Sequence, residues 1–375
     1  MNISRNSVIV AYSISHSIFP MKKMTLEQKN WLKKFNIKLR KSHSKEERSV
    51  RLISHSKKRI EFNKKLSLFH GNERTKIVKV LRSLSQNTYS QLYLDFRKLE
   101  LIEPLTALHI VHVLNKYKDL NVRFKSRHSQ SIVPRAVFTL LGLDKVLGLS
   151  KIRKNKPIEI VDNWHMFSGN NCDLPEDMQN HILMIYQKFT DQNIPFKLVT
   201  AINEAINNVI QHAYTKSSNV DFQKWYALTR IDEKCIVVVV SDLGVTIPQT
   251  APLSILEAFQ GKANKAKEVM LGADLSSLKD HSDSKLIQLA TNLDTTRTKE
   301  KGRGKGFNDI LDLVRRTDEF PEIEQVHTSV LSKSGSYLLQ SNSDGSAKEL
   351  SLNKNFDDFE SKIEGTVISW VIRLV

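Results

Sequence analysis

The sequence has little cysteine and no long apolar run. Its 375 residues include two cysteines, Cys172 and Cys235, which are far apart and lack the Cys-x-x-Cys or Cys/His spacing of a zinc site. A disulfide scaffold and a zinc finger are therefore excluded. Such a low cysteine content fits a protein of the reducing cytosol. No stretch approaches the ~20 apolar residues that a membrane helix needs. Residues 7–19 are mildly apolar but make a poor signal peptide, so we expect a cytoplasmic protein without membrane contact.

Positive charge is abundant but unevenly distributed. The net charge is +17, and residues 1–70 carry 17 Lys and Arg against 4 Asp and Glu. Residues 71–375 are nearly balanced in charge, with 40 Lys and Arg against 36 Asp and Glu. The sequence therefore predicts a basic N-terminal arm over 1–70, which could neutralise nucleic-acid phosphates or lie on an acidic partner. A solvated tail is the alternative, because no nucleic-acid-binding motif accompanies the charge.

Residues 71–150 have the pattern of a small α/β domain. Alternating apolar residues predict strands at 91–96 and 121–124, and apolar residues at helical spacing predict helices at 105–117 and 133–141. A strand-helix-strand-helix order favours parallel pairing of the strands.

This order resembles a STAS-like domain, the fold of anti-anti-sigma proteins. That family phosphorylates a serine at a helix start, but no serine stands at the matching place here and Thr106 is the nearest hydroxyl. The resemblance therefore implies docking to a protein partner, or a homodimer, rather than a phosphorylation switch.

Residues 151–175 read as a linker, and residues 176–375 read as a second α/β domain. Predicted helices lie at 175–190, at 196–214 and after Gly306, and predicted strands lie at 222–231, 235–241, 324–332, 336–341, near Lys348 and at 365–374. Helices on one face of a mixed sheet would form a two-layer α/β sandwich.

The helix predicted at 196–214 carries Glu204, Asn208 and His212 at a spacing of four. At about 100° per residue they follow one polar face of the helix. A carboxylate, an amide and an imidazole in a row can orient a water, hold a hydrated Mg²⁺ and meet phosphates. A solvent-facing helix edge would carry the same residue types.

Two glycine-containing segments add to this pattern. The apolar strand at 235–241 is followed by Asp242 and Gly244, where a carboxylate could accept a hydrogen bond from an exocyclic amine and glycine lets the backbone approach a flat ring. A strand-ending turn is the alternative.

The second segment has alternating glycines and basic residues directly before a helix: Gly302, Gly304, Lys305 and Gly306. Free backbone amides at a helix N-terminus can cradle phosphate, although a flexible basic loop would look similar. The spacing does not fit a Walker A loop.

Together these motifs resemble the GHKL ATPase family of gyrase, heat-shock chaperones, histidine kinases and MutL. The motifs match in order, namely Glu204 and Asn208 with the N box, Asp242 and Gly244 with the G1 box, Gly302 to Gly306 with the G2 box, and Thr366 with the final threonine. The resemblance covers residues 176–375 and implies a Bergerat-type site for ATP and Mg²⁺. In that site Glu204 would be the general base, Asn208 the Mg²⁺ ligand and Asp242 the adenine reader.

The same resemblance implies that residues 250–301 form a mobile ATP lid, and that His212, Ile247, Lys305 and Thr366 contact the nucleotide. One departure is Thr246, where the family usually has a second glycine. The form of the first motif is closest to anti-sigma serine kinases. His109 and His112 lack the sequence context of a phosphoacceptor histidine, so histidine autokinase activity is not expected.

The leading interpretation is a Mg²⁺-ATP-dependent regulatory protein, an ATPase or a protein serine/threonine kinase of GHKL type, with a protein partner at the STAS-like domain. One alternative is a switch or scaffold that binds nucleotide without hydrolysis. Another is an ATPase tethered to nucleic acid by residues 1–70. The sequence leaves the phosphoryl acceptor, the pathway, the oligomeric state and the start methionine open.

Overall fold

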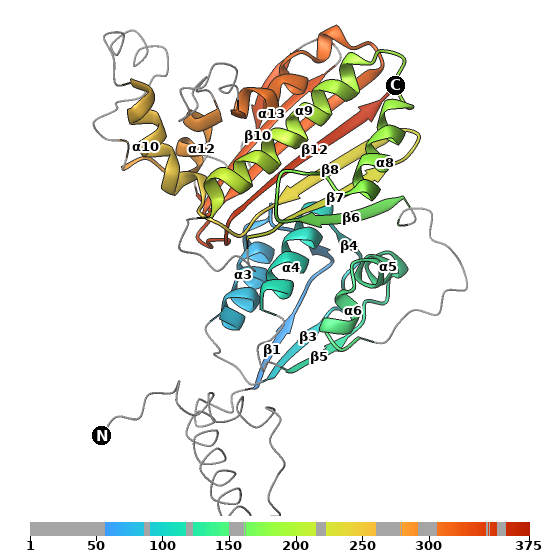
Figure 1. Ribbon diagram of the computed structural model, residues 1–375. Coiled ribbons are helices and arrows are strands. Elements are labelled where there is room, and N and C mark those ends of the chain that lie inside the picture. The colour runs from blue at the N-terminus through green and yellow to red at the C-terminus, as the bar shows by residue number, and fades with distance from the viewer. Residues whose placement is uncertain are drawn as a thin grey trace, which may run out of the picture. The chain divides into compact units, whose positions relative to one another are not determined.

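The protein is described here by a computed structural model (Figure 1). The described residues are 57–85, 91–117, 123–149, 161, 163–214, 223–259, 278, 280–291, 306–342, 344, 346–350 and 358–375. All of them belong to Ser56–Val375, one of the two units into which the chain divides.

A small parallel sheet opens the described chain. Strands β1 (Lys57–Glu61), β3 (Gln91–Asp95) and β5 (Arg123–Arg127) pair in parallel with β3 in the middle. The parallel pairing expected for β3 and β5 is confirmed. Strand β1 was not predicted and falls in the range assigned to the basic arm, because its Lys and Arg side chains conceal a single inward-facing Ile60. Strands β2 (Lys65–Leu66) and β4 (Leu101–Ile102) form a separate parallel pair.

Four helices pack on one face of this sheet. They are α3 (Gly71–Ser85), α4 (Pro104–Lys116), α5 (Ile132–Leu140) and α6 (Leu143–Val146). Helices α4 and α5 match the expected ranges, whereas α3 was not predicted.

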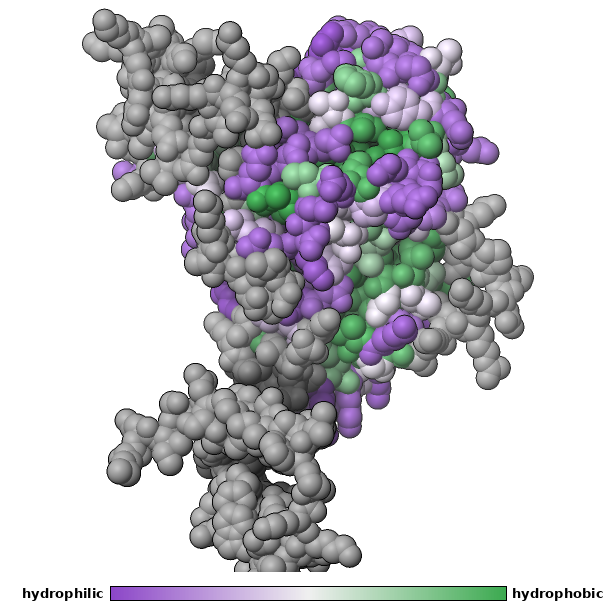
Figure 2. Space-filling view, in the orientation of Figure 1, coloured by the Kyte–Doolittle hydropathy of each residue, from purple (hydrophilic) through white to green (hydrophobic). Residues whose placement is uncertain are grey.

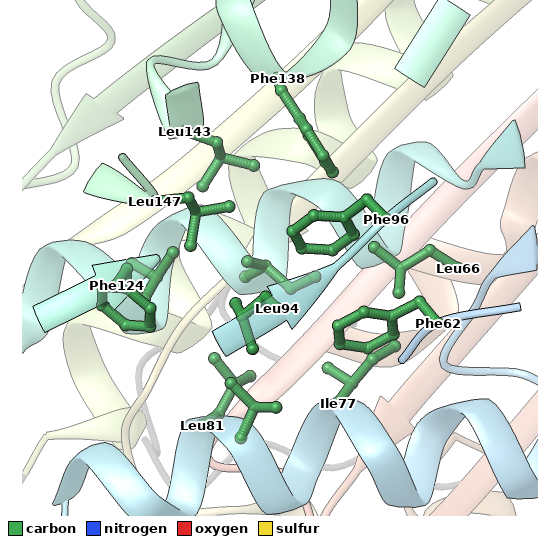
Figure 3. A pocket seen from close by; sticks show the side chains of 13 residues that line it. Phe62, Leu66, Ile77, Leu81, Leu94, Phe96, Phe124, Phe138, Leu143 and Leu147 are labelled. Atoms are coloured by element: carbon green, nitrogen blue, oxygen red, sulfur yellow. The ribbon is translucent and has the colours of Figure 1, made fainter. Parts of the chain in front are cut away.

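Between the small sheet and these helices lies a cavity of about 30 Å³ with exclusively apolar walls (Figure 3). Phe96 stacks on Phe62 with ring centroids 4.9 Å apart and meets Phe138 edge-on at 5.0 Å. Its lining offers water no polar partner, so the cavity is a packing feature of the core.

The second sheet has seven strands in the order β11-β10-β9-β12-β8-β7-β6. Their bounds are Trp164–Gly169 for β6, Trp225–Ile231 for β7, Cys235–Ser241 for β8, Ile323–Ser332 for β9, Gly335–Asn342 for β10, Ala347–Leu350 for β11 and Thr366–Leu374 for β12. Every neighbouring pair is antiparallel, so the expectation of a mixed sheet was wrong. Short turns join β7 to β8 and β9 to β10, which accounts for antiparallel pairing within these two hairpins.

Strand β6 lies inside the range predicted as a linker. Its apolar residues Trp164 and Phe167 are buried, and it extends the sheet beyond β7. The flanking polar sequence concealed this short edge strand from the pattern analysis.

Helices α8 (Glu176–Tyr186), α9 (Asn193–Asn208) and α13 (Gly306–Arg315) lie across one face of the large sheet, and α10 (Ile247–Phe259) and α12 (Asp283–Thr291) lie at one end (Figure 1). The apolar residues Ile202 and Ile206 of α9 are buried against the sheet. The last turn of the expected helix is π-helical, over Val209–Ala213.

The opposite face of the large sheet packs on α4. Alternation along β8 turns Val238 and Val240 toward the α9 side and Val237 and Val239 toward the α4 side. Helix α4 contacts β7, β8 and β12. Both faces of the sheet are therefore covered over these strands.

The surface combines hydrophilic areas with smaller hydrophobic ones, as the face in Figure 2 shows. Exposed large apolar side chains include Leu183, Met184 and Phe196. Among the helices that the structure describes, none is long and apolar enough to cross a membrane.

Candidate functional site

The candidate site is built around the point where β8 ends beside the start of β12. Asp242 directly follows β8, and its backbone N–H donates to the Thr366 carbonyl at 2.9 Å. The Thr366 hydroxyl lies 2.9 Å from that of Ser332 at the end of β9. Because three adjacent strands meet here, the backbone around Asp242 is fixed by the sheet itself.

Gly365 allows this close approach. Its φ is +64°, in the left-handed region, and a Cβ atom there would lie 2.1 Å from the Asp242 carbonyl oxygen. An L side chain would be strained by the backbone angle and would also overlap the neighbouring backbone. The glycine before the last strand is therefore required by its position.

The loop after β8 also contacts the C-terminal end of the α9 segment. A Cβ on Gly244 would lie 2.0 Å from the Ala213 carbonyl oxygen, and the next residue, Val245, donates its N–H to the same oxygen at 2.5 Å. The hydroxyl of Tyr214 accepts from the Leu243 N–H at 3.2 Å. The π-helical turn before Tyr214 thus positions this contact, and such turns are common at functional sites.

Asp242 is a buried carboxylate. Its residue is 5% exposed, and one carboxylate oxygen accepts the Gly244 N–H at 2.8 Å. Burial raises the pKa of Asp242 to about 7, against the lowering effect of backbone N–H donors from Gly244 and Thr366. A carboxylate held in an apolar setting with a perturbed pKa is typical of a binding or catalytic group.

Glu204 and Asn208 are half-buried on α9, at the expected spacing of four. The Asn208 side-chain nitrogen is buried and has no hydrogen-bond partner among the described residues. A buried unpaired donor costs free energy, so its presence favours a ligand that accepts a hydrogen bond. The His212 side chain lies outside the described part of the structure.

Thr246, the residue that departs from the family pattern, stands directly before helix α10. Its backbone N–H and hydroxyl both donate to the Gln249 side chain, at 3.2 and 3.0 Å, and the first of these bonds is one half of a capping box. The next residue, Ile247, donates its N–H to the Ser332 hydroxyl at 3.0 Å, which joins α10 to the strand end that contacts Thr366.

Helix α13 begins at Gly306, as expected, and packs alongside α9. An ion pair between Lys197 and Asp312 connects the two helices. Gly302, Gly304 and Lys305 lie outside the described residues, so their expected phosphate contacts stay predictions. Of the expected lid, 250–301, the structure describes most of α10 and the whole of α12 together with the residues just before it.

At the start of helix α4, the nearest hydroxyl that the sequence offers is not accessible. Thr106 is fully buried, and its hydroxyl accepts the Leu68 N–H at 2.9 Å. His109 and His112 on α4 are also buried, and burial lowers the pKa of His109 to about 3. Neither histidine is placed to receive a phosphoryl group from solvent-borne nucleotide.

The described residues contain no group of three or more His, Cys, Asp or Glu side chains that could hold a metal ion. Asn208 therefore has no cluster of acidic side chains around it in this part of the chain. Compared with known proteins, the chain matches no protein-family model and no curated protein sequence.

The motifs found in the sequence account for Asp242, Gly244 and Thr366, which the structure brings together. Sequence reasoning missed Ser332, which joins three segments through its hydroxyl, and gave no role to Tyr214 although it ends the first motif. No sequence signal marks Ser332, because a serine at a strand end is common.

Proposed function

We propose that the protein binds Mg²⁺-ATP at the end of β8 and acts as a cytoplasmic regulatory ATPase or protein serine/threonine kinase of GHKL type. The observation that carries the proposal is the junction at Asp242. A buried carboxylate, two glycines that admit no Cβ and the start of the final strand meet where the motif order would place a nucleotide base.

In this proposal the Asp242 carboxylate accepts the exocyclic amine of adenine. The amine would donate to the carboxylate in its ionised form, so binding favours loss of the Asp242 proton. Gly244 keeps the backbone close to the base. Thr366 and Ile247, both joined to Ser332, border the same junction.

Asn208 suits the phosphate end of the ligand. Its buried, unpartnered side-chain nitrogen is a donor for a phosphate oxygen, and rotating the amide by half a turn would offer its oxygen to Mg²⁺. Mg²⁺ commonly takes only one or two protein ligands and completes its shell with phosphate and water. A bound Mg²⁺ would neutralise charge on the phosphates.

Glu204 lies one helical turn before Asn208 and would take the proton of the attacking hydroxyl or water. His212 and the glycine loop with Gly302, Gly304 and Lys305 would complete the phosphate contacts. The acceptor of the γ-phosphoryl group is either water or a protein hydroxyl.

Full-length protein incubated with Mg²⁺ and γ-labelled ATP tests the reaction, with Glu204→Ala as the variant and Glu176→Ala, a carboxylate in the first turn of α8, as the matched control. Label released as free phosphate by the wild type and control, but not by Glu204→Ala, would identify an ATPase. Label on the protein or on an added partner would identify a kinase. ATP binding without either product in the wild type would contradict the catalytic part of the proposal.

A nucleotide-dependent switch is a second candidate, favoured by how the N-terminal helices contact the site. His112 on α4 lies 3.3 Å from the hydroxyl of Ser241, the residue before Asp242. Arg74 on α3 is fully buried and donates to the carbonyl of Lys333 in the β9–β10 turn at 2.7 Å. Lys333 in turn pairs with Asp283 at the start of α12, at 2.8 Å.

This chain of contacts connects the expected lid with the N-terminal helices. A change in α12 on nucleotide binding would therefore reach α3 through two residues, Lys333 and Arg74. Arg74→Met would uncouple them: nucleotide affinity would persist, whereas protease sensitivity of α3 would no longer respond to ATP. An unchanged response would exclude this connection.

A further inference from the structure

No described helix or strand covers the outer face of the sheet β1-β3-β5, and this face is rich in Lys and Arg. The helices α3 to α6 pack on the inner face, where Leu92 and Leu94 of β3 are buried. Side chains alternate along a strand, so Tyr93 and its neighbours in register face outward. Parallel sheets are usually covered on both faces. An open face on such a sheet therefore indicates a surface that meets a ligand.

One cross-strand row defines this surface. Arg59 on β1, Tyr93 on β3 and Lys125 on β5 stand side by side in register. Arg123 and Arg127 flank Lys125 on the same face of β5, and all three β5 cations are exposed. Alternate residues of a parallel strand are about 6.6 Å apart, a spacing comparable to that of successive phosphates in an extended nucleic-acid strand.

Tyr93 supplies a planar group at the centre of the row. The guanidinium groups of Arg59 and Arg127 lie 5.4 and 5.8 Å from the centroid of its ring. Aromatic rings and guanidinium planes are the groups on which unpaired bases stack. The surface thus combines a flat platform with flanking positive charge.

Part of the charge of this surface is neutralised, because Asp95 lies on the same face of β3 as Tyr93 and is in register with Arg127. Asp95 pairs with Arg59 and Arg97, each at 2.9 Å. Among the described residues, no carboxylate forms an ion pair with any of the three β5 cations. Strand β5 therefore presents three positive charges in a line that have no carboxylate partner among the described residues.

We propose that this outer sheet face, named here the β5 face and formed by Arg59, Tyr93, Arg123, Lys125 and Arg127, binds single-stranded nucleic acid. An acidic protein segment would satisfy the charges, whereas a nucleic-acid strand would also use the Tyr93 ring and the guanidinium planes of Arg59 and Arg127 for stacking. The chain's own segments are poor occupants, because residues 1–56 carry 12 Lys and Arg against 3 Asp and Glu, and residues 150–160 carry 4 against 1. Like charges repel, so neither segment complements this face.

The test uses the full-length protein and short fluorescent poly(dT) and poly(U) strands, with anisotropy measured across a salt titration. The variant Arg123→Gln/Lys125→Gln/Arg127→Gln removes the three β5 cations. Each phosphate contact contributes about 0.7 to the slope of log affinity against log salt for single strands. The variant is therefore expected to bind more weakly, with a slope smaller by about 2.

A matched control removes three exposed lysines elsewhere, in Lys79→Gln/Lys188→Gln/Lys234→Gln. The same charge is lost, so any effect of net charge or of the basic N-terminal residues appears equally in both variants. The variant Tyr93→Leu is expected to lower affinity by about 5-fold or more with an unchanged salt slope, because stacking is not ionic.

Equal binding by the β5 variant and the lysine control would overturn the proposal. The cations would then be explained as charges that protect the edge strand β5 from aggregation. Displacement by polyglutamate as effective as by poly(dT), at equal charge, would assign the face to an acidic protein instead. No effect of Tyr93→Leu would also overturn the proposal. Circular dichroism of each variant confirms that the fold is retained.

Discussion

Replacing Gly365 by alanine tests whether the start of β12 really meets the end of β8. The substitution should lower the free energy of unfolding in two ways. A left-handed backbone at φ +64° costs an L residue about 1–2 kcal/mol. The new Cβ would also lie 2.1 Å from the Asp242 carbonyl oxygen and 2.6 Å from the Leu243 Cα, both backbone atoms that cannot rotate away. Overpacking of this kind typically costs about 1–3 kcal/mol more.

The sum is about 2–5 kcal/mol, a large part of the total stability of a typical protein. With about 2–4 °C per kcal/mol for a domain of this size class, Gly365→Ala is expected to lower Tm by roughly 4–20 °C. Thermal and urea unfolding followed by far-UV circular dichroism measure the loss. The variant should also lose nucleotide binding, because the displaced backbone carries Asp242.

Gly142→Ala is the matched control. Gly142 also has a left-handed φ, +70°, but nothing lies within 4 Å of its added Cβ. The free energy of unfolding of Gly142→Ala should therefore fall only by the conformational cost of about 1–2 kcal/mol. A loss for Gly365→Ala no greater than that for Gly142→Ala would refute the close approach and the junction built on it.

Two further predictions concern titration and reactivity. Burial raises the pKa of Asp242 from 3.8 to about 7. Between pH 3.8 and about pH 7, the folded protein therefore holds a proton that the unfolded chain has released. The free energy of unfolding falls by up to about 4 kcal/mol as the pH rises through this range. Asp242→Asn should remove this dependence of stability on pH. Urea unfolding midpoints measured at about pH 5 and about pH 8 check the prediction. An equal pH dependence in the variant would mean that another group titrates. Cys172 is exposed, whereas Cys235 is half-buried and burial raises the pKa of its thiol. A thiol reagent should therefore label Cys172 quickly and Cys235 only slowly in the native protein. Equal labelling rates would contradict the packing of β8.

Much of the second α/β region could be predicted from its sequence, because its elements have strong periodic patterns. The helix at α9 and the hairpins β7–β8 and β9–β10 show clear spacing of apolar residues or tight turns. Strand β1 was missed because Ile60 is its only apolar residue, and β6 was missed because polar sequence flanks its apolar residues. Their burial depends on neighbours distant in sequence, which no local pattern encodes.

The candidate site was predictable where glycine or a charged residue is required by geometry. Asp242 interrupts an apolar strand end, and Gly244 and Gly365 stand where a Cβ would overlap backbone. The packing of α4 against β8 was not predictable, because an apolar helix face does not specify its partner. The contact between His112 and Ser241 belongs to the same class of long-range pairing.

The measurement that tests the central claim most directly is equilibrium binding of ATP to the full-length protein, with and without Mg²⁺, by isothermal titration calorimetry. The account predicts saturable binding that Mg²⁺ strengthens. Asp242→Asn should weaken it by roughly 10-fold or more, as expected for loss of a charged hydrogen-bond acceptor, whereas Asp232→Asn in the β7–β8 turn should leave it unchanged. Absence of ATP binding by the wild type, or equal affinity in the Asp242 and Asp232 variants, would contradict the account.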